Sequence, residues 1–403
     1  MKRPFDTFLA PMAGVNDFAF RLICKEQGAA LTYSEMVSAR GLASGNAATR
    51  ELLFALPEEG PLAVQIFGHE PALMAEQAAW IAADFKRRGQ ALALIDINMG
   101  CPARKIIKHG DGAALLTHPG LAPDIVKACR QALPDTVPLT VKFRKFDKIR
   151  HFGFAPEAFM PRQVGEEEIL NQVQDDLLSG TPYRVSPSSW EHSIGCPRVE
   201  ESRADANAEA RAAEATLHFA QDLEEAGVSA IALHGRSARQ MYQGRADREL
   251  FGMVAQTLSI PVAASGDVFS TDDIADYLSR GAAAVMVARG ARGNPWIFRG
   301  EPPTLEERFA ACRRHLELLA AYQPQHLITL RRHFAWYFKG VRSASALRVG
   351  LNQCSSAADF GRVLDEYEEA LTAGGQAAAT QAGSAPTAGQ TARPDPTSLE
   401  GVG

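Results

Sequence analysis

The sequence has few cysteines, and they follow no metal-binding spacing. Its 403 residues include six Cys, and no two of them are separated by just two residues. Cysteines this sparse and scattered exclude a disulfide framework and argue against a zinc site of the Cys type. We therefore expect a reduced, cytoplasmic protein that holds no metal.

Long apolar runs are also missing. The N-terminal segment MKRPFDTFLAPMAG lacks the apolar centre of a signal peptide, and nowhere do about 18 apolar residues follow one another. This predicts no signal peptide, no membrane span and no membrane partner. Positive charge is not in excess either, since the formal net charge is −5. That value excludes a histone-like coat of positive charge but allows a local basic face. We also expect a monomer.

The sequence does contain one repeated pattern, a short apolar and β-rich run followed by a helical segment. Continuous apolar runs of this kind are typical of parallel strands that are buried on both faces. The eight runs are residues 8–11, 31–35, 62–68, 94–100, 139–144, 230–236, 261–267 and 284–290. Eight units favour an α/β fold of the (β/α)8 TIM-barrel type over the alternative, an open doubly wound sheet.

Composition divides the chain into further parts. We predict that residues 1–303 form the barrel, interrupted by an irregular insertion at about 148–203 with one short helix at 166–178. Residues 304–371 have a helical pattern and are expected to form a small C-terminal helical domain. Residues 372–403 are rich in Ala, Gly, Thr, Gln, Pro and Ser. Such a segment buries too little apolar surface to fold, so we expect a disordered tail.

Polar residues collect at the C-terminal ends of the predicted strands, where barrels place their catalytic groups. Cys101 follows the fourth run, Lys142 ends the fifth and His234 ends the sixth. A free cysteine is usually a small buried hydrophobe, but a thiol at a barrel mouth can also transfer a proton. Lys142 fits either a structural salt bridge or a functional cation beside phosphate or a flavin. His234 fits either a buried core histidine or an anion-binding group.

The last two predicted strands end in turns that contain glycine. Ser265, Gly266 and Asp267 follow the seventh run, and Ala288 and Arg289 lie at the end of the eighth. Barrels commonly bind phosphate at this position through the backbone N–H groups of such turns. The two turns therefore predict a phosphate site.

A basic helical stretch follows the barrel. Residues 304–350 hold eight Lys and Arg against three Asp and Glu, with aromatic residues and histidines interleaved. One interpretation is an amphipathic bundle with a solvated charged face. The other is a surface that contacts the phosphate backbone of RNA, with Arg331 and Arg332 among its contacts.

Together these motifs resemble the tRNA-dihydrouridine synthases, flavoenzymes that reduce uridine in tRNA, and their bacterial B-type branch in particular. The stretches NMGCPARK (98–105) and HGRSARQMYQG (234–244) are highly specific for that family. The other matching stretches are LAPMAGVNDFAFRLICKEQGA (9–29), TYSEMVSARGL (32–42), VQIFG (64–68), TVKFR (140–144), SGDVFSTDD (265–273) and VMVARGARGNPWIF (285–298).

The resemblance implies an FMN-dependent enzyme that is reduced by NADPH or NADH. It implies that Cys101 is catalytic and gives a proton to uracil C5, that Asn98 positions the substrate or the ring, and that the helical domain binds tRNA. The residues that it places around FMN are Pro11, Met12, Ala13, Gln65 and Lys142 at the ring, and His234, Ser265, Gly266, Asp267, Ala288 and Arg289 at the ribityl phosphate.

The chain departs from this family in three places. Ser265 stands where Asn is usual, Ala288 stands where Gly is common, and the insertion at 148–203 follows the Lys142 strand. Backbone contacts survive the first two changes, and we expect the insertion to be inert. Two other functions remain open, namely an FMN barrel that acts on a free pyrimidine or other small molecule, and an RNA-binding protein that has lost catalysis.

Overall fold

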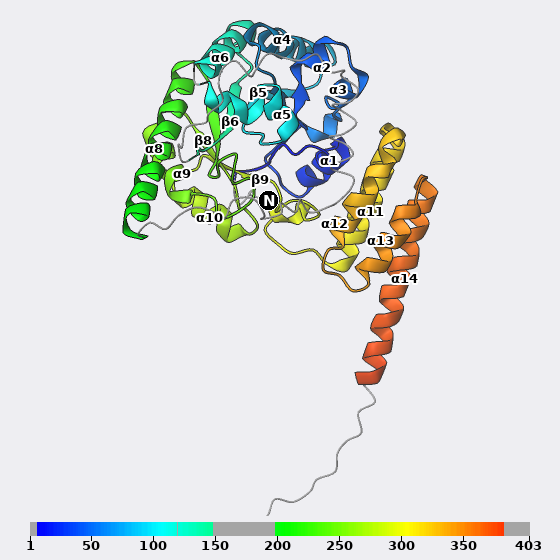
Figure 1. Cartoon of the computed structure of the whole chain (residues 1–403). Helices are drawn as coiled ribbons and strands as arrows, with labels where there is room; N and C mark the ends of the chain where they lie inside the picture. The colour runs from blue at the N-terminus through cyan, green and yellow to red at the C-terminus, as the bar shows by residue number, and fades with distance from the viewer. Residues whose placement is uncertain (1–5, 119, 148–197, 383–403) are drawn as a thin grey trace, which may run out of the picture.

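Eight parallel strands close into a barrel in the computed structural model (Figure 1), which describes residues 6–118, 120–147 and 198–382. Neighbouring strands pair in order around the ring, and β9 pairs with β1 to close it. The strands are β1 (Thr7–Leu9), β2 (Leu31–Tyr33), β4 (Leu62–Phe67), β5 (Leu92–Met99), β6 (Leu139–Arg144), β7 (Ala230–His234), β8 (Val262–Ser265) and β9 (Ala284–Val287). Each overlaps a predicted apolar run, so the predicted (β/α)8 barrel is confirmed. The two-residue strand β3 (Val37–Ser38) pairs with the far end of β4.

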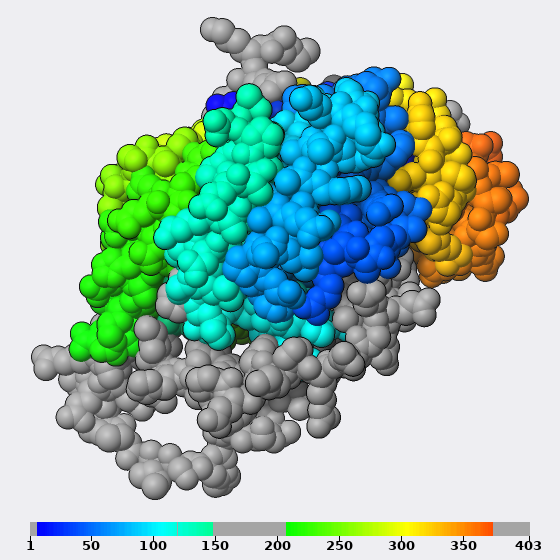
Figure 2. Space-filling view, turned by 90° about the horizontal axis from the view of Figure 1, so that it is seen from above, coloured from blue at the N-terminus to red at the C-terminus, as the bar shows by residue number. Residues whose placement is uncertain are grey.

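Long helices cover the outside of this barrel. They are α1 (Phe18–Glu26), α4 (Pro71–Arg87), α6 (Leu121–Ala132), α8 (Arg198–Glu225), α9 (Arg248–Thr257) and α10 (Thr271–Ser279). Figure 2 shows α4, α6 and α8 side by side on one outer face. Buried apolar side chains between these helices and the strands form the main core, and a smaller cluster, with Tyr33 and Met286, fills the barrel interior.

Short helical elements occupy the loops between strands and helices. They are α2 (Ala39–Ala43), α3 (Ala47–Glu51), the 3-10 helix η1 (Pro57–Glu59), α5 (Arg104–Lys108), η2 (Gly112–Thr117) and η4 (Pro295–Phe298). Within the described part of the chain, no helix is both long and apolar enough to cross a lipid bilayer.

A helical domain follows the barrel and lies beside α1 (Figure 1). Its elements are α11 (Leu305–Tyr322), η5 (Pro324–Thr329), α12 (Leu330–Tyr337), α13 (Ala344–Gln353) and α14 (Ala357–Ala382). Thr304 and Glu307 form a capping box that starts α11 where the barrel ends. Glu307 also accepts hydrogen bonds from Arg299, at 2.6 and 2.8 Å. This pair fixes the start of the helical domain to the last turn of the barrel.

Helices extend across two of the boundaries that were predicted from the sequence. Helix α14 continues to Ala382, so residues 372–382 are helical where we expected disorder. Alanine is the best helix former, and extending an existing helix needs no new nucleus. Helix α8 begins at Arg198, inside the predicted insertion at 148–203. The rest of the insertion, its predicted helix at 166–178 and the end of the predicted tail lie outside the described residues.

Candidate active site

A chain of hydrogen bonds crosses three neighbouring strands at the barrel mouth. On β5, Asp96 accepts from Thr140 Oγ1 of β6 (2.6 Å) and from Gln65 Nε2 of β4 (2.7 Å). Asn98 Nδ2 in turn donates to Gln65 Oε1 (2.8 Å). Burial raises the pKa of Asp96 to about 6, against the lowering effect of its two donors. The carboxylate is therefore still the prevailing form at pH 7, and it fixes the orientation of the Gln65 amide.

Cys101 lies in the loop directly after β5, where this network ends. The Cys101 N–H donates to Asn98 Oδ1 (2.9 Å), and the Gly100 N–H donates to the same oxygen (3.1 Å). The Cys101 carbonyl accepts from the Ala113 N–H (3.1 Å). A Cβ at Gly112 would come within 2.9 Å of that carbonyl oxygen, so the next loop packs tightly against Cys101. These contacts fix the position of the cysteine backbone.

The Cys101 thiol is partly buried, and its surroundings keep it protonated. Burial raises the pKa of the thiol, while the Ala103 N–H and the charges of Arg144 and Lys142 reduce that rise. At neutral pH the group is therefore a thiol rather than a thiolate. A positioned thiol can give a proton to a bound molecule, whereas a thiolate nucleophile would need a lowered pKa.

Lys142 and Arg144 lie on the same face of β6, because side chains two residues apart in a strand point the same way. Burial and the charge of Arg144 lower the pKa of Lys142 to about 8, while Asp96 opposes the change. Arg144 donates to the carbonyls of Gly100 (2.9 Å) and Ser237 (3.2 Å). Arg144, to which the sequence analysis gave no role, thus ties the loop before Cys101 to the loop after β7.

His234 ends β7 and is only 6% exposed. Burial, and after it the charges of Arg144 and Lys142, hold the pKa of His234 well below its usual value, so the ring is neutral at pH 7. Its Nδ1 atom has no hydrogen-bond partner among the described residues. A Cβ at Gly266 would come within 2.8 Å of His234 Cδ2, so glycine leaves room for the ring. A bound molecule could supply the missing hydrogen bond.

Arginines hold the turn after β8, which the sequence analysis predicted as part of a phosphate site. Asp267 has a left-handed backbone, with a φ of 50°. Its Oδ2 accepts from Arg236 Nη2 (2.5 Å) and the Ala246 N–H (2.9 Å), and its Oδ1 accepts from Arg289 Nη2 (3.1 Å). The Asp267 carboxylate therefore positions two arginines. The part of the turn that remains to bind a ligand is the backbone from Ser265 to Asp267.

Positive charge dominates this side of the mouth. Arg236 and Arg289 add to the charges of Lys142 and Arg144, and Arg236 Nη1 is buried without a hydrogen-bond partner among the described residues. The turn that begins at Ala288 packs closely on the turn after β8, because a Cβ at Gly290 would come within 2.1 Å of a backbone oxygen. The predicted residues of these two turns thus lie close together, and Asp267 accepts a hydrogen bond from Arg289.

The loop after β1, which includes Pro11–Ala13, is fixed by two polar side chains. Asn16 Nδ2 donates to the Ala10 carbonyl (2.8 Å), and the Gly14 N–H donates to Glu35 Oε2 (2.5 Å). Burial raises the pKa of Glu35 to about 7, and the Gly14 N–H opposes this rise. The sequence analysis assigned no role to Asn16 or Glu35. The one feature of the sequence that could have indicated a role for Glu35 is its position just after a strand.

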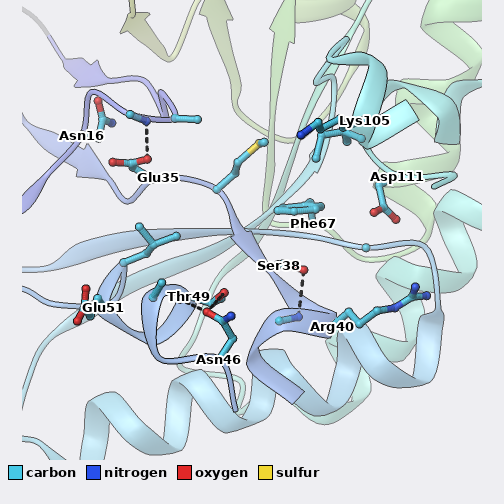
Figure 3. A pocket seen from close by; sticks show the side chains of 18 of the residues that line it. Asn16, Glu35, Ser38, Arg40, Asn46, Thr49, Glu51, Phe67, Lys105 and Asp111 are labelled. Carbon is cyan, nitrogen blue, oxygen red and sulfur yellow. Dashed lines mark hydrogen bonds between the residues drawn. The ribbon is translucent and has the colours of Figure 1, made fainter. Parts of the chain in front are cut away.

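A cavity of about 300 Å³ opens beside the mouth, between the barrel and the helical domain (Figure 3). Its lining comes from the loops after β1, β2 and β4, from α5 and from the helical domain. Figure 3 shows Glu35 on one side of this space and Lys105 and Phe67 on the other. Of the residues predicted from sequence, Ala13 and Arg332 line the cavity. It is therefore a second compartment, adjacent to the Cys101 loop.

The structure separates the two arginines that were predicted to bind the substrate. Arg332 lines the cavity, whereas Arg331 donates to the Cys354 carbonyl at 3.2 and 2.7 Å and holds the end of α13. Arg313 of α11 similarly pairs with Asp365 of α14 at 2.7 Å. Part of the basic charge noted in the sequence therefore stabilises the helical domain itself.

Comparisons with known proteins agree with this arrangement. The sequence model of the family described as Dihydrouridine synthase (Dus) matches residues 8–154 and 206–373. A tRNA-dihydrouridine synthase B from Shewanella oneidensis is 31% identical, over 90% of this chain and 95% of that protein. One from Xanthomonas axonopodis pv. citri is 31% identical over 91% and 93%, respectively. A probable tRNA-dihydrouridine synthase from Treponema pallidum is 32% identical over 89% and 92%. The chain therefore belongs to the dihydrouridine synthase family of enzymes, with bacterial B-type members among its relatives.

Proposed function

We propose that this protein reduces specific uridines of cytoplasmic tRNA to 5,6-dihydrouridine, using FMN and NADPH, with Cys101 as the proton donor. The observation that carries the proposal is Cys101 at the barrel mouth, whose backbone is fixed by Asn98 and whose thiol is kept protonated by burial. The names of the relatives support tRNA as the substrate and dihydrouridine as the product.

The residues of the mouth fit FMN. A phosphate group would meet the backbone of Ser265–Asp267 and the arginines that Asp267 positions, and barrels bind phosphate at this place. His234 Nδ1 and Arg236 Nη1, both buried and unpartnered among the described residues, would gain hydrogen-bond partners from the same molecule. Ala288 and Arg289 are the remaining residues that were predicted to contact the ribityl phosphate of FMN.

The Pro11–Ala13 loop and the side chains of Gln65 and Lys142 would hold the flavin ring. Gln65 uses one N–H and one oxygen lone pair within the network, which leaves a second N–H and a second lone pair for the ring. Lys142 is charged below pH 8, so it stabilises negative charge on a bound ring. The chemistry that bound FMN would supply, once reduced by NADPH, is a hydride for uracil C6.

The chain itself contributes orientation and the proton. Cys101 donates its thiol proton to uracil C5, and the positive charges of Lys142 and Arg144 then stabilise the resulting thiolate. Asn98 holds the Cys101 backbone in place and, through Gln65, couples that position to the flavin contacts. A rigid acid of this kind contributes through position as well as through its pKa.

The cavity beside the mouth is the proposed entry for the nucleotide. A base in folded RNA must leave its stack to reach a site at the bottom of a barrel. Arg332 of the helical domain and Lys105 of α5 both line this cavity, and they would pair with backbone phosphates on either side of the extruded base. Of the two arginines predicted from sequence, we propose that Arg332 contacts RNA directly. Arg331 would contribute indirectly, by holding the end of α13.

The test is dihydrouridine formation, measured by nucleoside mass spectrometry after incubating the purified protein with unmodified tRNA, FMN and either NADPH or NADH. Product establishes the reaction, and mapping it on the tRNA gives the position. A protein that holds FMN and oxidises NADPH, but reduces free uridine and leaves tRNA unchanged, would overturn the proposed substrate. A protein that binds tRNA without binding flavin would overturn the catalytic proposal.

A further inference from the structure

Two histidines of the helical domain meet one carboxylate of the barrel, away from the catalytic mouth. Asp17 begins α1, His315 lies on α11 and His333 lies on α12. His315 Nε2 lies within hydrogen-bonding distance of both carboxylate oxygens of Asp17 (3.1 and 3.2 Å), and His333 Nε2 is 3.2 Å from Asp17 Oδ2. The side chains of the two histidines are 0% and 1% exposed, and that of Asp17 is 14% exposed. The two imidazoles are therefore buried, and the carboxylate that they approach is partly exposed.

The surroundings leave these three side chains little freedom to move. Asp17 Oδ1 also accepts from the Phe20 N–H (2.8 Å), which caps α1. His315 Nδ1 lies 3.2 Å from the Tyr337 hydroxyl oxygen. The His333 ring packs against the rings of Phe20 and Trp336, with centroids 5.3 and 5.0 Å away. The ligand atoms of the three residues are thus held in place from outside the cluster.

A simple hydrogen-bonded cluster does not explain the surroundings of His333. Neither of its ring nitrogens makes a hydrogen bond of good geometry among the described residues, although Nε2 is close to Asp17. A nitrogen that approaches a carboxylate at a poor hydrogen-bond angle is expected when both atoms point at a third centre between them. Buried polar groups without partners are rare in folded proteins.

We propose that Asp17, His315 and His333 bind a divalent transition-metal ion, most favourably Zn²⁺. Nitrogen and carboxylate oxygen are ordinary zinc ligands, with bonds of about 2.0–2.2 Å. Ligand atoms of a tetrahedral site then lie roughly 3.3 Å apart, and here one atom from each of the three residues lies within 4.8 Å of the other two. A His₂Asp set leaves the fourth position for water, and the cavity reaches Asp17, which gives water and the ion a path.

The charges around the cluster permit a cation. Arg21, which also lines the cavity, is neutralised by Glu59 at 2.7 Å. Arg332 on α12 faces the carboxyl of Glu35 as well as Asp17. The hydroxyl of Tyr337 supports His315 from behind, as the outer partners of metal-bound histidines do. The expectation of no metal rested on the sparse cysteines, and Asp17, His315 and His333 are far apart in the chain and follow no spacing motif.

The proposed ion has a structural role and does not depend on the proposed reaction. It would join the start of α1 to α11 and α12, and so connect the barrel to the helical domain. Binding to the folded state alone would also raise the unfolding temperature as the metal concentration rises.

The experiment uses the full-length chain without a histidine tag. Metal content is measured by inductively coupled plasma mass spectrometry after gel filtration, and chelator-treated protein is then titrated with Co²⁺ while the visible spectrum is recorded. We expect one ion per chain and the intense visible bands of four-coordinate Co²⁺. Protein that takes up no stoichiometric metal, or gives the spectrum of hydrated Co²⁺, would show a metal-free hydrogen-bonded cluster and overturn the proposal.

Variants assign the ion to this cluster. Asp17→Asn keeps a side chain that can cap α1 but removes the anionic ligand, and His333→Gln removes one imidazole. Each should weaken Co²⁺ binding at least roughly 100-fold, the upper range seen even for outer-shell changes. His326→Gln is the matched control, because His326 also joins the two domains, through Glu51 at 2.8 Å, without belonging to the cluster. Uptake that is unchanged in both cluster variants would place the ion elsewhere and refute the assignment.

Discussion

Replacing Cys101 with alanine should separate cofactor binding from turnover. The hydrogen bonds that hold residue 101 to Asn98 and Ala113 involve its backbone atoms, so the variant keeps them. We therefore expect normal folding and normal FMN content. Turnover on tRNA should fall roughly 10²–10⁴-fold, the usual contribution of a positioned general acid. That loss corresponds to about 2.7–5.4 kcal/mol of transition-state stabilisation.

Cys101→Ser is the matched control for shape. The hydroxyl has nearly the size of the thiol but is a far weaker acid, so it restores packing without restoring easy proton transfer. We expect its rate to remain close to that of the alanine variant. In the wild-type protein, burial raises the thiol pKa above its ordinary value of 9.0. The thiol therefore stays protonated across the neutral range, and the rate should not decline there through loss of this proton.

The assay is a single turnover of enzyme that has been reduced with NADPH and then mixed with unmodified tRNA. Dihydrouridine is counted by mass spectrometry at successive times, and bound flavin is measured by absorbance after gel filtration. An alanine variant that makes product within a few-fold of the wild-type rate would refute Cys101 as the acid. Loss of flavin from that variant would instead show that residue 101 belongs to the cofactor site.

Three further outcomes are expected. The affinity of the apoprotein for FMN should decline as pH rises through about 8, since Lys142 then loses its charge. Lys142→Gln should lack this decline. Parallel curves of FMN affinity against pH for the two proteins would contradict the assignment. Gly266→Ala should destabilise the fold by roughly 1–3 kcal/mol in urea unfolding, because its Cβ meets His234, and an unchanged midpoint would argue against that contact. Arg332→Ala should weaken tRNA binding and reduce the salt dependence of that binding by about one counterion. Arg331→Ala should mainly lower the unfolding midpoint, because a carbonyl at the end of α13 loses its donor. Equal salt slopes of tRNA binding in the two variants would refute the distinction.

The barrel could be predicted from sequence because its signals are local. Each strand is an apolar run, and each run ends in polar residues, so the order of Cys101, Lys142 and His234 along the chain already placed them at one edge. Parallel strands that close into a ring bring their ends together without any further information. The structure confirms this consequence for the strands, and the family comparison supports it independently.

Side-chain partners could not be predicted in the same way, because they depend on contacts between distant segments. Arg144 bonds to loops on both sides of its strand, and Glu35 holds a loop that precedes it by one strand. Arg331 looked like a surface cation in the sequence but holds a helix end. A count of charges records which groups are present but does not say which of them are already paired within the fold.

The carboxylate of Asp17 has a consequence for the RNA. It caps α1, ends the loop that begins at Pro11, and contacts both His315 and His333. Swinging the helical domain away would therefore separate both histidines from Asp17 and expose two buried rings. Such an opening is costly, so the gap between the two domains has a nearly fixed width. In the proposed reaction, the target nucleotide would therefore have to reach the site without a large opening between the two domains.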